Sequence, residues 1–141
     1  MSPFEKILFL NKIPLFRNLK SRDLHLITSI INEEAFDDQE KLFEEGDYGD
    51  KLFMVVSGSV DIFQDRKGIP EKIAACEKYD FLGEMSLLDG ENRSATGICS
   101  APSSFLTIEK SDLGQLIHEY PDISFGIFEA LCSRLRELMK K

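Results

Sequence analysis

The pattern of apolar and polar positions divides the chain into helical ends and a β-rich middle. Near the N-terminus, Leu24, Ile27 and Ile31 recur at helical spacing after Ser21, a residue type that caps helix N-termini well. The spacing therefore predicts a helical leader over residues 1–36.

Short apolar runs separated by turn residues fill the middle of the chain. The apolar run at 52–56 is interrupted by Ser57-Gly58-Ser59, and Val60 and Ile62 then alternate with polar positions. A glycine inside a strand pattern marks a bulge or a tight corner, so we expect one at Gly58. A hairpin turn is predicted at 65–68, with further strands at 73–76, 95–99 and 104–108. Short strands with frequent turns favour a β-sandwich or a barrel.

Two helices are predicted to close the chain, the first capped by Ser111 and the second starting at Pro121. The second helix carries an apolar stripe, which consists of Ile123, Ile127, Phe128, Leu131, Leu135 and Leu138. Four of these positions, from Phe128 onwards, also fit a coiled-coil seam. Two heptads do not decide between packing within the domain and a homodimer, so both alternatives stay open.

Composition and charge remove several classes of function. With 141 residues and 43% apolar positions, the chain is long enough for one globular domain, which we expect to span residues 1–141. The net charge of −8 argues against a nucleic-acid partner, because duplex binding needs a basic surface. Residues 33–50 carry nine acids and one lysine but lack the EF-hand spacing, so we predict a solvated acidic face.

The cysteines and the hydropathy indicate a cytoplasmic protein. Cys76, Cys99 and Cys132 are widely spaced and form no metal-binding motif, as expected of reduced thiols, and we predict no metal site. No apolar run approaches the ~18 residues of a membrane helix, so we expect no membrane partner.

The chemistry of the chain concentrates in residues 81–96. Gly83 precedes a short helical run whose free backbone N–H groups favour an anion. Arg93 can grip a phosphate through two parallel hydrogen bonds. Glu84 can only accept hydrogen bonds, which suits a sugar hydroxyl. The segment thus combines a phosphate clamp with a ribose acceptor.

This segment resembles the phosphate-binding cassette of the cyclic nucleotide-binding domain family, which includes the catabolite activator, kinase regulatory subunits and gated channels. The family pattern of Phe-x-Gly-Glu, a hydrophobic run, a short loop and Arg-(Ala/Thr/Ser)-Ala is present, with Asn92 where proline is common. Residues 45–60 also follow the first β-half of the family. The similarity therefore covers nearly the entire chain.

The resemblance implies an architecture and a set of binding residues. The architecture is mainly β with flanking α: an eight-stranded jelly-roll β-barrel over 37–110, with N-terminal helices before it and two C-terminal helices over 111–141. The ligand would be cAMP, with cGMP as the alternative. A serine at position 94 weakly favours cAMP. The expected binding residues are Gly83, Glu84, Met85, Arg93, Ser94 and Ala95. The resemblance points less specifically to residues around the ribose and the base, which are Ile62, Ile73, Ala74, Arg134, Leu135 and Leu138.

The function that these inferences favour is a non-catalytic cyclic nucleotide sensor that transmits binding through movement of its C-terminal helix. The alternative is a structural or interaction module of the same fold without ligand. A metalloenzyme of the cupin type would need several histidines, whereas only His25 and His118 exist and both fall in predicted helices. A DNA-binding regulator would need a helix-turn-helix domain after the last helix, and the chain stops at Lys141. We therefore expect no catalytic residues and no cofactor.

Overall fold

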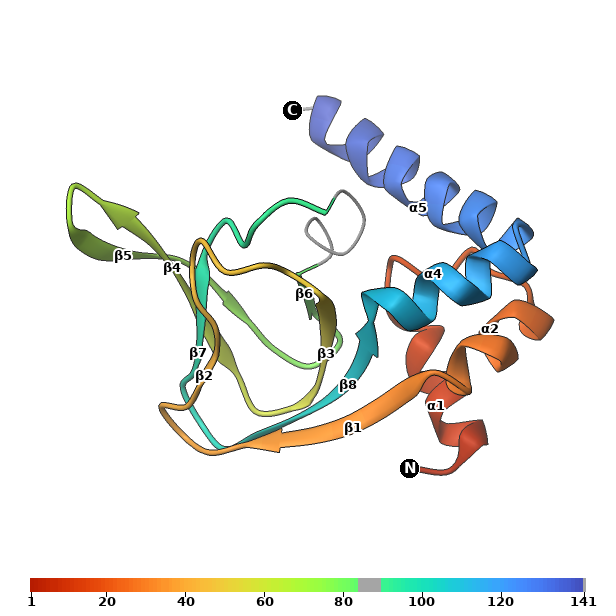
Figure 1. Ribbon diagram of the computed structural model, residues 1–141, viewed down its shortest axis with the longest axis horizontal. Helices are drawn as coiled ribbons and strands as arrows, with labels where there is room; N and C mark the ends of the chain where they lie inside the picture. Colours follow the sequence, from red (N-terminus) through yellow and green to blue (C-terminus); the bar gives the residue numbers. More distant parts are fainter. Residues whose placement is uncertain (84–89, 141) are drawn as a thin grey trace. The chain divides into compact units, whose positions relative to one another are not determined.

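The computed structural model of the chain describes residues 1–83 and 90–140 (Figure 1). The chain divides into two compact units, which we describe separately. The helical unit consists of Met1–Ile31 together with the segment from Ser111 onwards, and the β unit consists of Asn32–Lys110.

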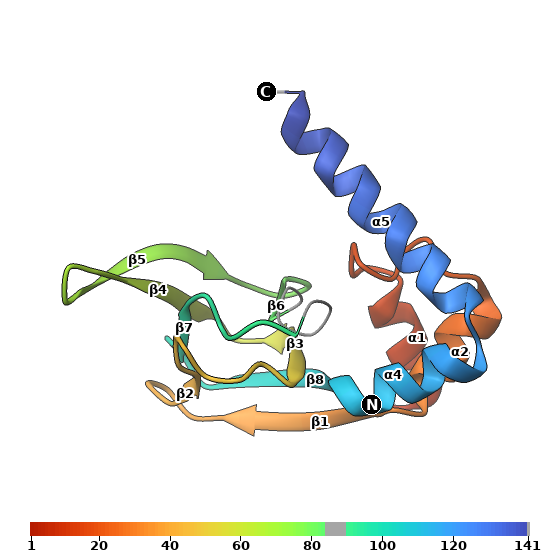
Figure 2. The ribbon, with the colours of Figure 1, turned by 45° about the horizontal axis from the view of Figure 1, so that its top comes forward.

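The β unit contains two four-stranded sheets whose strands come from distant parts of the sequence. The first has the order β1-β8-β3-β6, and the second has the order β2-β7-β4-β5. In the first sheet β3 pairs antiparallel with both β6 and β8, and in the second β4 does so with β5 and β7. Figure 2 shows β1 and β8 running along each other. The strands are β1 (Ile31–Phe36), β2 (Lys41–Phe43), β3 (Lys51–Ser57), β4 (Val60–Arg66), β5 (Ile69–Cys76), β6 (Phe81–Leu82), β7 (Thr96–Cys99) and β8 (Ser103–Glu109).

The core of the β unit forms between the two sheets. Successive side chains of a strand point to opposite faces, so each sheet contributes one apolar face. Phe53 and Phe105 from the first sheet pack edge-to-face with a centroid distance of 5.7 Å, and Phe36 packs against both. Val60 and Cys99 come from the second sheet and are fully buried in the same cluster. The arrangement is a β-sandwich with aromatic side chains at its centre.

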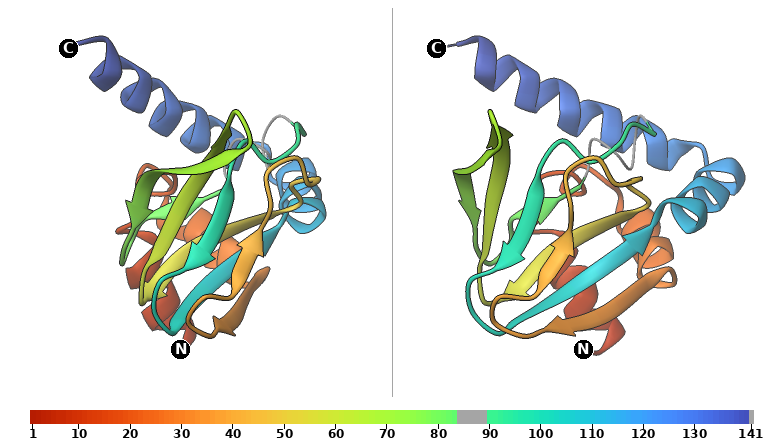
Figure 3. Two further views of the ribbon diagram at one scale, coloured as in Figure 1. Left: turned by 90° about the vertical axis from the view of Figure 1, so that its left-hand side faces the viewer. Right: turned by 60° about the vertical axis from the view of Figure 1, so that its left-hand side comes forward.

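The mainly-β architecture with flanking helices is confirmed, whereas a closed barrel is not. Among the described residues the strand pairing leaves two separate sheets rather than one continuous ring. The tight corner at Gly58 is confirmed, since its φ of +88° lies in the region that favours glycine. The predicted hairpin at 65–68 also forms, and its two strands extend beyond the part of β4 that pairs with β7 (Figure 3). Strand β5 is longer than predicted, because it begins at Ile69 rather than at 73.

The helical unit contains four described helices, namely α1 (Pro3–Leu10), α2 (Ser21–Thr28), α4 (Lys110–Glu119) and α5 (Asp122–Met139). Helix α1 opens with a capping box between Ser2 and Glu5. The predicted cap at Ser21 is wrong by one position, because Lys20 holds the N-cap and its side chain makes no capping bond. Ser111 likewise lies inside α4, which starts at Lys110, because the helix follows β8 without a loop. Pro121 is the N-cap of α5, close to its predicted role.

The leader is not helical throughout, because Ile31 opens β1 instead of closing α2. A helical stretch predicted from Ile27 and Ile31 thus ends at Thr28, and the chain turns at Ser29 and Ile30. No described helix is long and apolar enough to cross a membrane.

Helix α5 has two apolar faces rather than one. Ile123, Gly126, Ile127 and Ala130 are buried within the helical unit. Gly126 packs so closely on Leu19 that a Cβ at this position would collide with Cδ2 of Leu19. The other face exposes large apolar side chains, which are Phe125, Phe128, Leu135, Leu138 and Met139. The single stripe predicted from the sequence therefore combined residues that belong to different faces.

Candidate functional site

Arg93 is a buried cation whose backbone is fixed on both sides. Its residue is only 5% exposed. The N–H of Arg93 donates to the carbonyl of Asp47 at 2.7 Å, and the carbonyl of Arg93 accepts from the N–H of Gly46 at 2.9 Å. An isolated β-bridge between Tyr48 and Asn92 continues this pairing. The loop before β7 is therefore tied to the Gly46 turn, which fixes the position of the arginine.

The guanidinium of Arg93 is held by two neighbours inside the β unit. Nη2 donates to the backbone carbonyl of Lys51 at 2.7 Å. Cζ lies 4.5 Å from the centroid of the Phe43 ring, which is a cation–π geometry. A buried charge is costly without such partners, and together they hold the planar group in one orientation.

Gly83 lies directly against this guanidinium. Its φ is +87°, and a Cβ at this position would collide with Nη1 of Arg93 and lie 2.9 Å from the carbonyl oxygen of Lys51. Glycine is therefore required here both by the backbone conformation and by space. The structure thus brings together Gly83 and Arg93, two residues that the sequence pattern placed in one site.

Lys51 connects the arginine to a second polar network. Its Nζ lies 3.0 Å from Oε2 of Glu34, which also accepts a hydrogen bond from Oγ1 of Thr107 at 2.7 Å. Burial alone would raise the pKa of Glu34, but the hydrogen bonds from Thr107 and Lys51 and the lysine charge outweigh it and leave the pKa lowered. The carboxylate is thus kept ionised next to the strand that supplies the Lys51 carbonyl.

The remaining predicted residues of the β unit lie in different environments. Ala95 is buried, whereas Ser94 is exposed and its carbonyl accepts a hydrogen bond from Nε2 of Gln64 at 3.1 Å. Ile62 packs against the core from the inner face of β4. Ala74 pairs with Ile62 across β4 and β5, so the two lie on the same face of the sheet, but Ala74 is exposed. Ile73 is the extra residue of a β-bulge between the Ile62 and Phe63 pairs and is 44% exposed.

Five predicted site residues cannot be placed at the arginine. Glu84 and Met85 lie outside the described residues. Arg134, Leu135 and Leu138 are exposed residues of α5 in the helical unit. Their contacts with a nucleotide stay predictions.

Phe43 and Lys51 were missed from the sequence. Neither is part of the cassette at 81–96. Lys51 contacts the arginine through its main-chain carbonyl, which every residue type has, so the sequence gives no signal for it. The only available signal was the position of Phe43 just before the Glu45-Gly46 motif of the family's first β-half.

A β-sandwich that holds a buried arginine against a glycine of positive φ defines a candidate anion-binding domain. Comparison with known families makes the class specific, because the model of the cyclic nucleotide-binding domain matches residues 33–120. The chain belongs to the cyclic nucleotide-binding domain family.

Curated relatives and solved structures agree with this assignment. The chain is 31% identical over 125 residues to the cyclic AMP receptor protein of Thermus thermophilus, covering 88% of this chain and 58% of that protein. It is 30% identical over 134 residues to the cGMP-dependent protein kinase egl-4 of Caenorhabditis elegans, covering 92% of this chain and 17% of the kinase. The chain therefore spans only part of the length of these relatives.

Among solved structures, the N-terminal domain of a transcriptional regulator from Streptomyces coelicolor aligns with a TM-score of 0.83 at 27% identity, covering 92% of this chain and 94% of that chain. The catabolite activator protein of Thermus thermophilus aligns with a TM-score of 0.75 at 30% identity, covering 89% of this chain and 59% of that chain. The fold of the β unit and its helices is thus shared with regulatory proteins.

Proposed function

We propose that this chain is a non-catalytic sensor of a cyclic purine nucleotide, with cAMP as the favoured ligand. The observation that carries the proposal is Arg93, which is buried and held by Lys51 and Phe43 beside Gly83. A guanidinium held in one orientation can bind a phosphate through two parallel, charge-assisted hydrogen bonds. The curated relatives named for cAMP or cGMP support the class of ligand.

In this proposal the arginine pairs with the exocyclic phosphate, and Gly83 leaves room for the guanidinium beside it. Glu84 accepts the ribose 2′-hydroxyl, and the backbone N–H groups at Glu84 and Met85 add donors to the phosphate. Ile62 and the exposed Ala74 supply the apolar wall, since they pair across β4 and β5 and lie on the same face of the sheet. Both histidines lie in helices, His25 in α2 and His118 in α4, which supports a role without catalysis.

The choice between cAMP and cGMP depends on contacts with the purine edge. Ser94 is the residue after the arginine and is exposed, so its hydroxyl has access to solvent or ligand. In the family a threonine at this position helps cGMP, and serine or alanine is commoner in cAMP binders. We therefore expect the chain to bind cAMP more tightly than cGMP. The substitution Ser94→Thr should reduce the difference between the two affinities.

The output of the sensor would be helix α5. Its exposed residues follow one another at alternating spacings of three and four, the pattern of a coiled-coil seam, and they are Phe125, Phe128, Cys132, Leu135 and Met139. This seam differs from the one predicted through Leu131 and Leu138, because Leu131 is half-buried. A nucleotide that favours one position of this helix would shift a pre-existing equilibrium. We propose that the seam pairs with a second copy of the chain and that the paired helices pass the signal to an output domain or partner.

The direct test is calorimetric titration of cAMP into the wild type, Arg93→Ala and Arg66→Ala. Arg66 is the matched control, because it is an exposed arginine of the β4–β5 hairpin whose only described ion pair is with Glu71 at 3.4 Å. We expect Arg93→Ala to weaken binding by about 2–3 kcal/mol, since a phosphate would lose charge-assisted hydrogen bonds. Arg66→Ala should bind like the wild type. Circular dichroism of each variant verifies the fold.

Equal affinities of wild type and Arg93→Ala would reject the arginine's role. Absence of any heat or thermal shift with cAMP and cGMP would instead favour a structural module of the same fold, because a ligand that binds the native state raises stability by mass action. Acyclic AMP serves as the ligand control and should bind more weakly than cAMP.

A further inference from the structure

The sheet that carries the nucleotide residues has a second face, which lines a groove. Side chains alternate along a strand, so Phe63 points away from the core cluster that contains Ile62. Phe63 pairs with Thr96, and Ile98 pairs with Lys41 on its other side. These four side chains therefore share the outer face of the sheet, opposite to the face of Ile62. We call the cavity that they border the outer-face groove.

The outer-face groove has the size and floor of a binding site. Its volume is about 650 Å³, within the range of known ligand sites, which runs from roughly 300 to 1,000 Å³. Phe63 and Ile98 are half-buried and form an apolar floor, and Pro70 borders it from β5. The neighbouring strands β4 and β7 supply this floor, so it lies within the hydrogen-bonded second sheet.

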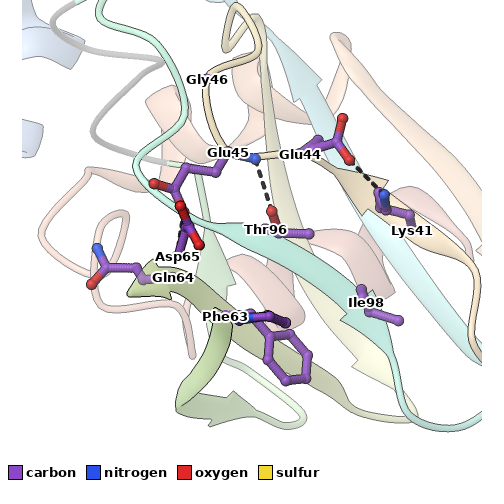
Figure 4. A pocket seen from close by; sticks show the side chains of 10 residues that line it. Lys41, Glu44, Glu45, Gly46, Phe63, Gln64, Asp65, Thr96 and Ile98 are labelled. Carbon is purple, nitrogen blue, oxygen red and sulfur yellow. Dashed lines mark hydrogen bonds and ion pairs between the residues drawn. The ribbon is translucent and has the colours of Figure 1, made fainter. Parts of the chain in front are cut away.

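The rim of the groove is acidic. Glu44, Glu45 and Asp65 border it, and Lys41 is the one lysine among its lining residues. That lysine is already paired, since its Nζ lies 2.6 Å from Oε1 of Glu44. Figure 4 shows Glu45 and Asp65 at one end of the groove and the Lys41–Glu44 pair near Ile98 at the other.

Hydrogen bonds hold the acidic rim in place over the floor. The backbone N–H of Glu45 donates to Oγ1 of Thr96 at 2.8 Å, and Oε1 of Glu45 accepts from the backbone N–H of Asp65 at 3.0 Å. Among the described residues no side chain pairs with the carboxylate of Asp65. The basic neighbour Lys72, opposite Phe63 on β5, is paired with Asp61 at 3.2 Å. Negative potential thus remains beside an apolar surface.

We propose that the outer-face groove docks a short segment of a partner protein in which a bulky apolar side chain stands next to a lysine or arginine. The apolar side chain would lie on Phe63 and Ile98, and the cation would pair with Asp65 and Glu45. Charge complementarity selects this occupant: an anionic ligand is repelled by the rim, and a second copy of this chain carries a net charge of −8 itself. The site lies on the opposite face of the sheet from Ile62, so it can be occupied together with the nucleotide site.

The test uses the whole chain and three tetrapeptides, each acetylated and amidated: Arg-Leu-Phe-Lys, the charge-reversed Glu-Leu-Phe-Asp, and Arg-Gly-Ser-Lys without the apolar anchor. Each is titrated into isotope-labelled protein, and amide chemical shifts are followed by NMR with and without saturating cAMP. We expect saturable shifts for the first peptide alone, at residues of β2, β4 and β7. Binding should be the same with and without cAMP, so a failure of the proposed nucleotide site does not affect this result.

Two sets of variants make the result specific. Phe63→Thr with Ile98→Thr should weaken the first peptide at least about tenfold, because it removes the apolar floor while threonine, a β-branched residue, suits both strands. Asp65→Lys, at an exposed hairpin position, should weaken it by a factor of about five to ten through loss of the ion pair. Asp38→Lys introduces the same charge change in the exposed β1–β2 loop and should leave the affinity unchanged.

Several outcomes would overturn the proposal. They are the absence of saturable shifts in the groove, equal binding of the charge-reversed peptide, and equal effects of Asp38→Lys and Asp65→Lys. Shifts of the groove residues that depend on protein concentration without any peptide would identify a second copy as the occupant instead. Binding of arginine amide as tight as that of the tetrapeptide would identify a small cation.

Discussion

In the β unit a charged side chain is buried, whereas in the helical unit large apolar side chains are exposed. Arg93 is 5% exposed and contacts a carbonyl and an aromatic ring, while Phe125 and Leu138 on α5 are 61% and 64% exposed. Both arrangements run against the usual distribution of residue types. Each is explained if a ligand or partner completes it.

The two regions differ in how much of the arrangement the chain completes alone. The arginine has its backbone, its carbonyl partner and its glycine neighbour already in place, so the chain itself organises this part of the proposed phosphate site. Within the helical unit no described residue buries the exposed face of α5. Its apolar side chains would leave water only if another molecule bound there. We therefore expect substitutions in the first region to affect folding and ligand binding, and substitutions in the second to affect assembly.

The largest effect is expected from Gly83→Ala. The new Cβ would collide with the guanidinium of Arg93 and approach the carbonyl of Lys51, and φ would stay at an unfavourable +87°. We expect a loss of about 3 kcal/mol in the free energy of unfolding, measured by urea denaturation.

Gly68→Ala is the matched control for Gly83→Ala. Gly68 has a φ of +84°, but a Cβ there meets nothing within 4 Å. Its cost should be only the conformational strain of about 1 kcal/mol. Equal costs for the two variants would contradict the close packing of Gly83 on the arginine.

Arg93→Lys separates charge from shape at the same site. Lysine keeps the positive charge but loses the planar fork that spans the carbonyl and the ring. We expect cAMP affinity to fall by about tenfold, or roughly 1.4 kcal/mol, in a calorimetric titration, which is less than for Arg93→Ala because the charge is kept. An affinity within about threefold of the wild type would mean that a point charge is sufficient and that the fixed orientation has no role.

Phe128→Glu tests the exposed face of α5. A carboxylate in a coiled-coil seam is costly, so we expect the dissociation constant of a dimer to rise at least tenfold, about 1.4 kcal/mol, in analytical ultracentrifugation. Phe4→Glu is the matched control, because Phe4 is a 69% exposed phenylalanine of α1. A monomeric wild type at all concentrations would reject dimerisation through this helix.

Cys132 offers a second measurement of the same helix pairing. It is exposed in the proposed seam, while Cys99 is buried and its burial raises the pKa of its thiol. Two parallel helices would bring both copies of Cys132 together, so mild oxidation should give a disulfide-linked dimer that Cys132→Ser abolishes. Crosslinking that persists in Cys132→Ser would place the contact elsewhere.

The smallest effect is expected from Glu34→Gln, which weakens the network behind Lys51. Because the pKa of Glu34 is lowered in the folded state, its ionised form stabilises the fold above the ordinary pKa of 4.5. This contribution is lost as the pH falls through the lower folded value. At pH 7 the variant should lose about 1 kcal/mol, and the difference from wild type should shrink below pH 4.5.

Glu71→Gln is the control for this pH dependence, because Glu71 is in an exposed ion pair with Arg66. It should change stability by less than about 0.5 kcal/mol over the same pH range. A Glu34→Gln difference that stays constant down to pH 3 would show that the carboxylate's ionisation does not stabilise the fold.

Local signals made much of the fold predictable. The Gly58 corner, the 65–68 hairpin and the helix start at Pro121 each depend on residues close in sequence. The helix faces were harder, because Phe128 and Ile127 are both apolar and only tertiary packing decides which of them is buried. Ile31 was placed in a helix for a similar reason, since the spacing fitted while the pairing into β1 involves distant strands.

The candidate site was predictable only where side chains carry the signal. Gly83 and Arg93 were found from their motif, and the structure places them in contact. Phe43 contributes through a long-range contact that the motif does not contain. The outer-face groove had no sequence signal, because its acids and apolar residues come from four strands and connecting turns that only the sheet register brings together.

The partner of Arg93 at position 51 is a peptide carbonyl, which every amino acid possesses. Evolution can therefore exchange the lysine side chain without removing the acceptor, provided that the strand keeps its path. The lysine side chain has a separate contact, since its Nζ pairs with Glu34 at 3.0 Å. A comparison by residue identity alone would overlook this carbonyl, whereas an insertion that displaced the strand would move it away from the guanidinium without altering Arg93.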